Sequence, residues 1–248
     1  MKPSFYRTAM VLGEEAEQRL DGACAVVFGV GGVGGHCVDA LARCGVGNLF
    51  LIDSACVKQS NLNRQICAKK STIGMKKVEA MKMHVEDVSD CRVIAVDAFA
   101  MPENICELIP ENADIVIDAV DTVTAKIAVI IEAKRRGIPV LSSMGAGNRF
   151  DPTCVRSTDI YKTSIDPLAR VMRRELKKRG VEELTVVYST EEPIVPLIPT
   201  PDPDMKPNAP ASVPFVPGAF GLALAKLAVE EILKNRNGDE FLNEPQKY

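Results

Sequence analysis

The feature that most constrains the fold is a glycine-rich turn between a short apolar run and a helical pattern. The turn, Gly29-Val30-Gly31-Gly32-Val33-Gly34, follows the apolar run Ala23 to Phe28 and opens a helix over Val33 to Cys44. Glycines let the backbone come close to a phosphate, and the helix N-terminus adds unpaired N–H groups and a partial positive charge. We therefore expect a nucleotide phosphate to bind at four glycines: Gly29, Gly31, Gly32 and Gly34.

Short apolar runs continue to alternate with helical patterns through the first half of the chain. Further strands are expected at Leu49 to Ile52, Val93 to Val96, Ile115 to Ile117 and Val140 to Leu141. Further helices are expected at Lys76 to Val88 and Thr124 to Arg136. Alternation of this kind, with continuous apolar strands, implies a mostly parallel sheet with helices on both faces. The predicted fold class is α/β, doubly wound and Rossmann-like.

The second half of the chain has a different character. A strand at Thr185 to Tyr188 precedes residues 193–217, a stretch of 25 residues with nine prolines, and a last helix is expected at Ala219 to Leu233. The proline density predicts that 193–217 is a crossover loop, neither helix nor central strand. Loops of this length usually have a function. We predict one domain over residues 1–248, in which 1–141 binds the nucleotide and 142–248 forms the substrate side.

Composition excludes several classes of protein. Apolar residues make up 46% of the 248 residues and charged residues 25%, which is ordinary globular usage. No run approaches the roughly 20 apolar residues of a membrane-spanning helix, so we expect a cytoplasmic protein without a membrane partner. The formal net charge is -3, so any nucleic-acid surface has to be a local patch.

The eight cysteines do not form a zinc pattern. No two of them have the C-x-x-C spacing, so we expect no zinc and interpret most of them as reduced core residues. The only cysteine after Cys106 is Cys154, so residues 193–217 contain none. Transfer of an acyl group to a thiol of that loop is therefore unavailable to this chain.

Polar residues after three of the expected strands separate two kinds of nucleotide chemistry. Asp53 ends the second strand, where a carboxylate can bind ribose hydroxyls. Arg64, Lys77 and Asp121 lie on three separate loops that can converge on the phosphate site. The glycine turn alone also fits an NAD-dependent dehydrogenase. Attack on the α-phosphate of ATP, however, needs cations for the phosphoryl oxygens and an acid for Mg²⁺, and this set favours ATP.

These motifs together resemble the ThiF/MoeB/E1 superfamily of adenylating enzymes over nearly the whole chain. The resemblance implies ATP and Mg²⁺ as cofactors and a homodimer as the assembly. Asp53 corresponds to the ribose ligand, and Asp121 to the Mg²⁺ ligand. The triphosphate contacts correspond to Asn61, Arg64 and Lys77. Arg7 resembles an N-terminal arginine that acts across the dimer interface. The resemblance thus implies Arg64, Lys77 and Asp121 as the catalytic set.

Residues 142 to 235 resemble one branch of that superfamily, the tRNA threonylcarbamoyladenosine dehydratases. The matching segments are residues 158–163, 166–170, 187–191 and 212–217. The resemblance implies that tRNA is the substrate and that the threonylcarbamoyl carboxylate on adenosine 37 is adenylated. A neighbouring carbamoyl atom then closes a ring with net loss of water. The nucleophile is already on the substrate, so no enzyme cysteine is needed. A sulfur-relay protein is a further partner that this resemblance allows.

A cationic pattern in the second half suggests where RNA phosphates bind. Five basic residues recur at helical spacing within Asp166 to Arg179: Arg170, Arg173, Arg174, Lys177 and Lys178. On a helix they share one face, with Leu168, Val171, Met172 and Leu176 roughly opposite. We predict that this stripe binds tRNA, as a local basic face in a net-negative protein can. The competing interpretation is a solvated amphipathic face.

Two other functions stay open from the residues alone. The first is activation of the C-terminal carboxylate of a ubiquitin-like or sulfur-carrier protein, against which the missing zinc pairs and the missing loop cysteine argue. The second is a nucleotide-sensing or scaffold protein without catalysis, against which Arg64, Lys77 and Asp121 argue. The dehydratase is the function that the sequence favours.

Overall fold

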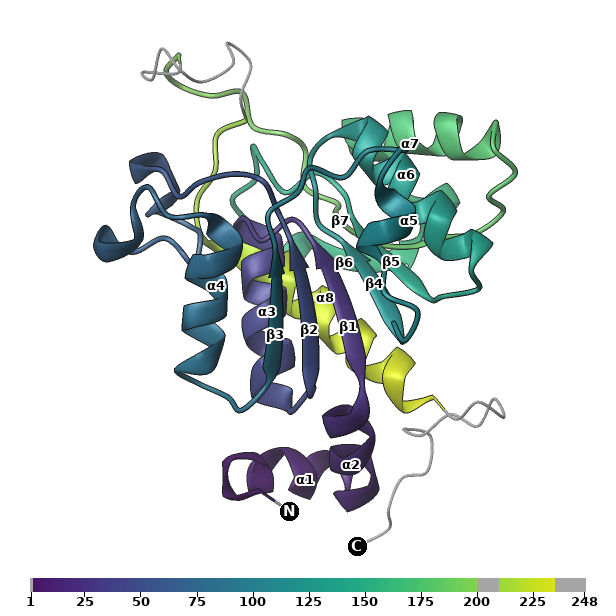
Figure 1. The fold of residues 1–248 in the computed structure, drawn as a ribbon. Coiled ribbons are helices and arrows are strands. Elements are labelled where there is room, and N and C mark those ends of the chain that lie inside the picture. The colour runs from purple at the N-terminus through teal and green to yellow at the C-terminus, as the bar shows by residue number, and fades with distance from the viewer. Residues whose placement is uncertain (1, 200–209, 235–248) are drawn as a thin grey trace, which may run out of the picture.

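The computed structural model describes residues 2–199 and 210–234, which form one seven-stranded sheet with helices on both faces (Figure 1). The strands are β1 (Cys24–Phe28), β2 (Asn48–Ile52), β3 (Arg92–Val96), β4 (Ile115–Asp118), β5 (Val140–Ser143), β6 (Val155–Asp159) and β7 (Thr185–Ser189). Their order across the sheet is β3-β2-β1-β4-β5-β7-β6, and every pair is parallel except β6 with β7. The predicted α/β, mostly parallel fold is therefore confirmed.

Eight α-helices in the described ranges connect and cover these strands. They are α1 (Tyr6–Leu12), α2 (Glu14–Gly22), α3 (Gly32–Cys44), α4 (Lys77–Glu86), α5 (Ile105–Leu108), α6 (Val123–Arg135), α7 (Pro167–Lys177) and α8 (Phe215–Leu233). Short 3-10 turns lie at Pro3–Phe5, Gln59–Asn61, Lys70–Thr72, Pro152–Cys154 and Ile160–Lys162. None of the helices in these ranges is long and apolar enough to cross a bilayer.

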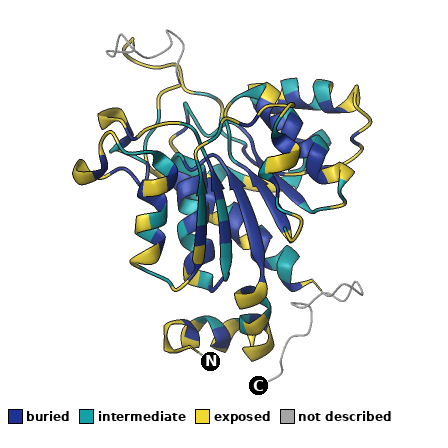
Figure 2. Ribbon diagram, in the orientation of Figure 1, coloured by how far each residue is buried: buried dark blue, intermediate teal, exposed yellow. Residues whose placement is uncertain are grey.

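The central strands are buried because helices pack on both sides of them. All five residues of β1 are buried, and its side chains alternate between two apolar clusters. Ala25 and Val27 join the cluster built with α3, α4 and α8, whereas Val26 and Phe28 join the one built with α5, α6 and α7. Figure 2 shows the central strands in dark blue between helices whose outer faces are exposed. Because alternate side chains are buried on opposite faces of the sheet, the sequences of these strands are unbroken apolar runs.

Close packing of α8 on α3 brings the start of α8 to the glycine turn. A Cβ atom at Gly221 would lie 2.5 Å from the carbonyl oxygen of Val33, so only a glycine allows this approach. Nearer the helix start, a Cβ at Gly32 would lie 3.3 Å from the Cβ of Pro217. Residues from the far end of the chain therefore lie beside the first helix.

One expectation about the proline-rich stretch is wrong. Residues 193–217 were expected to contain no helix, yet α8 begins at Phe215 and includes Pro217. The first turn of a helix has N–H groups without intrahelical partners, so a proline there loses no hydrogen bond. The described residues before Pro214 in this stretch are neither helix nor strand, and residues 200–209 lie outside the described ranges.

Candidate active site

The glycine turn lies at the carboxyl edge of the sheet, where β1 meets β2 and β4. Gly29 N donates to the carbonyl oxygen of Ile52, 2.8 Å away, and has a φ of +84°, which favours glycine. A Cβ at Gly34 would lie 1.8 Å from the carbonyl oxygen of Gly29. Gly31 is the N-cap residue of α3, so the turn presents the free N–H groups of that helix. This geometry fits a bound phosphate.

Asp53, which follows β2, lies directly against the turn. Its Oδ2 accepts a hydrogen bond from Val30 N (3.0 Å), and its Oδ1 accepts one from Ala55 N (2.8 Å). Each carboxylate oxygen has a further lone pair that can accept from a hydroxyl group. The structure therefore places Asp53 where the sequence predicts a ribose ligand.

The segment after β2 returns to the glycine turn and brings two predicted phosphate contacts with it. The Arg64 Cγ would lie 3.5 Å from a Cβ at Gly32, beside the start of α3. Its Nη1 donates to the Ser60 carbonyl oxygen (3.0 Å) and to Asn63 Oδ1 (2.8 Å), and burial lowers the pKa of the guanidinium. Asn61 is buried, and its Oδ1 accepts from Lys58 N at 3.0 Å. Only the Nδ2 group of Asn61 is thus left to contact a phosphate.

The two lysines at the start of α4 have different surroundings. The Lys76 Nζ pairs with Asp97 Oδ2 (2.9 Å) and donates to the Ser54 carbonyl oxygen (3.2 Å). Lys77 is half-buried, and its ammonium group has no hydrogen bond or ion pair within the described residues. Burial raises the pKa of the Cys67 thiol to about 11, the Lys77 charge opposes this rise, and the Asp53 charge adds to it. Lys77 is therefore the lysine whose charge is available near the turn.

The loop after β4 forms the other wall of the site. Ala119 N donates to the Phe28 carbonyl oxygen (2.8 Å), and a Cβ at Gly29 would lie 2.7 Å from the Ala119 carbonyl oxygen. Asp121 ends this loop, is exposed, and accepts one long hydrogen bond from Thr122 Oγ1 (3.4 Å). A single carboxylate beside a phosphate site fits Mg²⁺, which keeps several waters and also binds substrate phosphates. No group of three or more His, Cys, Asp or Glu side chains with metal-site geometry occurs among residues 2–199 and 210–234.

A buried ion pair beneath this loop is not predicted by any sequence motif. Lys126 Nζ lies 2.8 Å from Asp118 Oδ2 with both side chains fully buried, and Ser142 Oγ donates to the same Oδ2 (2.6 Å). The Lys126 ammonium also donates to the Val120 carbonyl oxygen (3.1 Å), while Val120 N donates to Asp118 Oδ1 (3.3 Å). Both polar groups of Val120, just before Asp121, are thus fixed. The available signal was one charge at the end of the apolar strand β4 and one among the apolar residues of the first half of α6.

Arg7 is the predicted nucleotide-site residue that lies away from the glycine turn within a single chain. It is exposed on α1, which lies with α2 at the amino edge of the sheet, whereas the glycine turn lies at the carboxyl edge (Figure 1). Gly47 N, at the start of β2, donates to the Leu20 carbonyl oxygen in α2 (2.9 Å) and fixes this placement.

Comparisons with known proteins agree with this geometry. The model of the ThiF family matches residues 5–247. This chain belongs to the ThiF family. It is 38% identical to the tRNA threonylcarbamoyladenosine dehydratase of Bacillus subtilis over 250 residues, which cover 95% of this chain and 96% of that protein. This ThiF-family chain also matches the Escherichia coli tRNA threonylcarbamoyladenosine dehydratase in its crystal structures.

Two of those crystal structures contain nucleotides. The complex with AMP superposes with a TM-score of 0.86, and the complex with ATP with a TM-score of 0.85. Both are 34% identical to this ThiF-family chain and cover 93% of it; the match covers 94% and 93% of those chains, respectively. The resemblance stated from the sequence motifs is therefore confirmed at the level of the family and of the fold.

In the predicted basic stripe of this ThiF-family chain, three of the five side chains already have hydrogen-bond or ion-pair partners. Arg173 turns inward, and its Nη1 donates to the Thr163 carbonyl oxygen (3.0 Å) and to the Thr163 hydroxyl oxygen. Arg174 Nε and Lys178 Nζ each lie 3.1 Å from Glu175 Oε1. Arg170 and Lys177 are exposed and have no side-chain hydrogen bond or ion pair within the described residues. Four of the five residues lie on α7 and Lys178 is its C-cap residue, but together they do not form one uniform cationic face.

Only four of the eight cysteines of this ThiF-family chain are buried, although the sequence predicts that most of them are core residues. Cys24, Cys37, Cys67 and Cys91 are buried, as expected for core residues, whereas Cys56 and Cys106 are exposed. Burial raises the pKa of Cys24 to about 11 and that of Cys91 to about 12, which suppresses the reactive thiolate. Cys154 is half-buried and donates to Asp151 Oδ2 at 3.5 Å.

Proposed function

We propose that this protein is an ATP-dependent tRNA threonylcarbamoyladenosine dehydratase. The observation that carries the proposal is the match to the Bacillus subtilis enzyme over nearly the full length of both chains. The glycine turn, Asp53, Arg64 and Lys77 at one sheet edge support the same chemistry. A carrier-activating enzyme is the less supported alternative, because the full-length matches are to dehydratases.

The proposed reaction uses ATP as its second substrate and conserves atoms as follows. A carboxylate oxygen of the threonylcarbamoyl group attacks the α-phosphorus of ATP, and pyrophosphate leaves. A carbamoyl atom of the same substrate then attacks the acyl carbon, loses its proton, and displaces AMP, which keeps the carboxylate oxygen. The product is a ring with one water fewer. Because both reacting groups are on one nucleoside, ring closure has a high effective molarity and needs no enzyme thiol.

Each predicted site residue has a role in this proposal. Asp53 holds the ribose. Arg64 and Lys77 neutralise the charge that builds on the phosphoryl oxygens and on pyrophosphate, and the Asn61 amide assists them. Asp121 would hold Mg²⁺, which would neutralise further phosphate charge. The carboxyl end of the β4 strand and the fixed Val120 peptide support this carboxylate.

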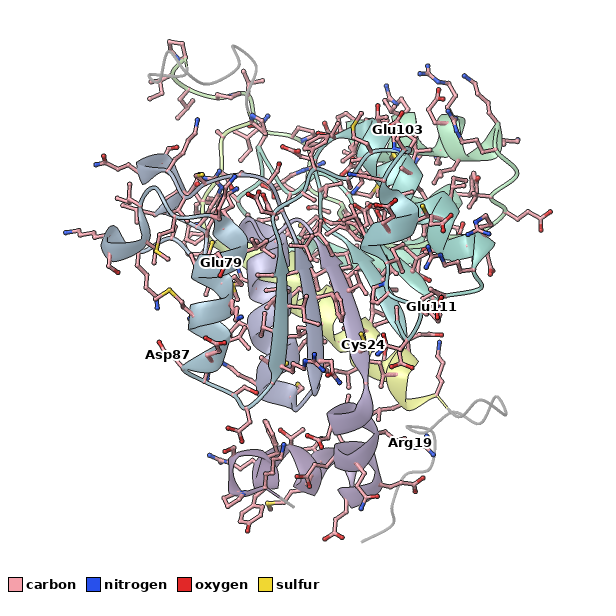
Figure 3. The ribbon with its side chains drawn as sticks, in the orientation of Figure 1. Arg19, Cys24, Glu79, Asp87, Glu103 and Glu111 are labelled. Atoms are coloured by element: carbon pink, nitrogen blue, oxygen red, sulfur yellow. The ribbon has the colours of Figure 1, made fainter. Side chains whose placement is uncertain are left out.

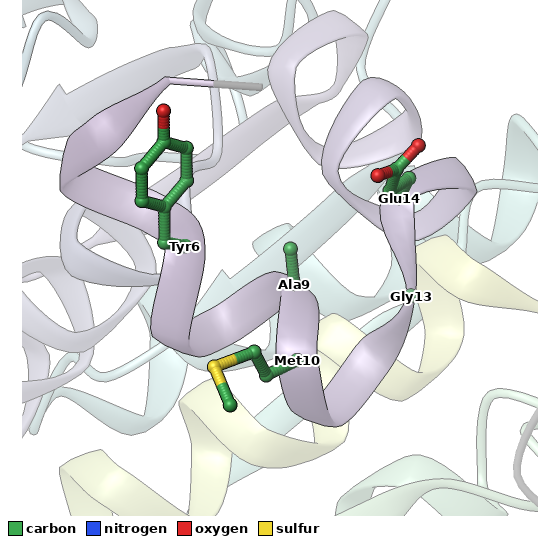
Figure 4. Close-up of a pocket in the computed structure, with 5 residues that line it drawn as sticks. All are labelled: Tyr6, Ala9, Met10, Gly13 and Glu14. Atoms are coloured by element: carbon green, nitrogen blue, oxygen red, sulfur yellow. The ribbon is translucent and has the colours of Figure 1, made fainter.

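We further propose a homodimer in which Arg7 serves the site of the other copy. Within one chain Arg7 lies at the sheet edge opposite the glycine turn, so it can act only on a second molecule. Its helix α1 exposes three large apolar residues, Tyr6, Met10 and Val11, with 49%, 83% and 79% of their surface accessible. Figure 4 shows the hollow on this helix, which is lined by Tyr6, Ala9, Met10, Gly13 and Glu14. Such an apolar face is typical of a protein contact.

We also propose a cellular location and partners for this protein. A tRNA-modifying enzyme works where tRNA is used, so we propose that it is cytoplasmic. The phosphates of tRNA are proposed to contact the α7 basic residues. A sulfur-relay partner stays a prediction from the family resemblance.

Mass analysis of nucleosides tests the function directly. tRNA that carries threonylcarbamoyladenosine is incubated with the protein, Mg²⁺ and ATP, then digested to nucleosides. We expect a product lighter by one water, together with AMP and pyrophosphate, and no product when ATP is left out. Unchanged threonylcarbamoyladenosine in the complete reaction would contradict the proposal. A thioester between Cys154 and a carrier protein would move the assignment to the alternative.

A further inference from the structure

Two exposed phenyl rings lie in contact near the site and have no role in the chemistry above. Phe150 follows β5 and is 58% exposed, and Phe215 opens α8 and is 52% exposed. Their ring centroids are 5.7 Å apart and the rings are perpendicular, at 87°. Exposed aromatic side chains are the surfaces on which unstacked RNA bases are held. We propose that Phe150 and Phe215 form a stacking site for the adenine that carries the reacting carboxylate, an inference that rests on the proposed function.

The rings lie beside the phosphate end of the nucleotide site. Pro217, two residues after Phe215, lies so near the start of α3 that a Cβ added at Gly32 would be 3.3 Å from its own Cβ. The Asn63 Nδ2 donates to the Ser212 carbonyl oxygen (2.9 Å), which ties the segment before Phe215 to the residue next to Arg64. A base stacked here would therefore have its carboxylate within reach of the phosphate turn.

Sheet topology separates this pair from the adenosine of ATP. Asp53, the proposed ribose ligand, follows β2, whereas Phe150 follows β5. The glycine turn after β1 lies between them in the order β2-β1-β4-β5. The nucleoside of ATP would therefore extend toward β2, whereas the loop that carries Phe150 lies on the β5 side of the turn, where we place the acyl substrate.

The loop that carries Phe150 is held firmly by its backbone. Both oxygens of the Glu191 carboxylate accept from Phe150 N (3.1 and 3.0 Å), and one of them also accepts from Asp151 N (3.0 Å). Asn148 N donates to the Ala211 carbonyl oxygen, and Ala211 N donates to Asn148 Oδ1, each at 2.7 Å. These bonds join the two ring-bearing segments. A ring whose backbone is already fixed loses little freedom when a base stacks on it.

The perpendicular arrangement of the two rings limits the orientation of a bound base. One base cannot be parallel to both rings, so one ring offers its face and the other its edge, as aromatic groups prefer. Phe150 is the more exposed ring and takes the face contact. Stacking involves no phosphate, so it adds affinity without adding to the salt dependence of binding.

A single-tryptophan variant tests the stacking directly. The chain has no tryptophan, so Phe150→Trp introduces the only indole. The probe is an anticodon stem-loop RNA that carries threonylcarbamoyladenosine, and the matched RNA is abasic at that nucleotide. We expect the modified RNA to quench indole fluorescence and the abasic RNA to leave it unchanged at saturation. Equal quenching by both RNAs, or quenching by neither, would overturn the stacking site.

The matched protein control is Met83→Trp. Met83 is 51% exposed on α4, in the part of that helix that runs from Glu79 toward Asp87 and away from the carboxyl edge (Figure 3). Its indole should respond to neither RNA. A response to the modified RNA equal to that of Phe150→Trp would mean that the quenching does not report this site, and it would also overturn the proposal.

A truncation gives a second test that needs no new side chain. Phe150→Ala should weaken binding of the modified stem-loop about tenfold or more, with the same salt dependence as the parent protein and unchanged ATP affinity. Phe150→Tyr should restore the binding. Loss of ATP affinity instead would assign the rings to the adenine of ATP and overturn the proposal. If the parent protein dehydrates the nucleoside while Phe150→Ala binds RNA normally, only the stacking site fails; if the parent has no activity, the proposed function fails.

Discussion

At the scale of single residues, the cations beside the glycine turn differ in how far they are already paired. Lys77 has no partner among the described residues, and Arg64 binds one carbonyl and one amide oxygen, whereas Lys76 is paired with Asp97. We expect Arg64→Ala and Lys77→Ala each to lower kcat by about 100-fold or more, since one lost transition-state contact costs roughly 2.7–4 kcal/mol. Lys76→Ala is the matched control and should keep most activity. Turnover at saturating ATP and tRNA, with thermal melting for folding, measures this. A Lys77 variant as active as the Lys76 variant would remove Lys77 from the catalytic set.

The buried pair of Lys126 and Asp118 makes a prediction about stability. Removing one partner leaves the other charge buried without compensation, which costs about 3–5 kcal/mol. Lys126→Met should therefore lower the free energy of unfolding by that amount, as measured in urea. Adding Asp118→Leu should recover much of the loss, because an apolar pair of similar volume is often neutral. Turnover of the double variant should stay low, since Val120 loses two contacts beside Asp121. A single variant that costs less than about 1 kcal/mol would mean that water reaches this pair.

At the scale of elements, the open question at α7 is whether its exposed basic residues bind RNA phosphates or only contact solvent. Arg170 and Lys177 are exposed and unpaired within the described residues, whereas Arg173 is engaged with Thr163. We expect Arg170→Gln with Lys177→Gln to weaken tRNA binding and to reduce the slope of log K against log salt by about 0.7 to 0.9 per lost phosphate contact. Arg173→Gln should change the slope little and destabilise the loop at Thr163 instead. Titrations at several salt concentrations measure the slopes. If the double variant keeps the parental slope, α7 is a solvated face and tRNA binds elsewhere.

Elements whose apolar pattern is strong could be predicted from the sequence, and those without one could not. β1 and α3 were predicted to within a residue because the apolar run ends at the glycine turn. β6 was missed because Val155–Asp159 has one apolar residue and pairs only at the sheet edge, where exposed polar side chains are tolerated. The motifs predicted Asp53, Arg64 and Lys77 together, but pairing of Lys126 with Asp118 depends on the packing of α6 on β4. Spacing along the chain does not encode that contact.

At the scale of the whole molecule, the proposed dimer uses two opposite edges of the sheet. The carboxyl edge carries the proposed nucleotide site, and the amino edge carries α1 with Arg7 and its exposed apolar residues (Figure 1). A lone chain cannot bring these edges together. We propose that two copies related by a two-fold axis each offer α1 to the other, and on this proposal dimerisation is a condition for a complete site.

Mixing two inactive variants tests this arrangement. Arg7→Ala and Lys77→Ala homodimers should both have low activity, because every site lacks one of the two cations. In a mixed dimer, the site of the Arg7→Ala protomer has its own Lys77 and receives Arg7 from the other protomer, so it is complete. The second site lacks both cations. Random exchange of equal amounts makes half of the dimers mixed, so about a quarter of the sites should be active. If Arg7 acts within its own chain, no site in any dimer is complete, and mixing restores nothing.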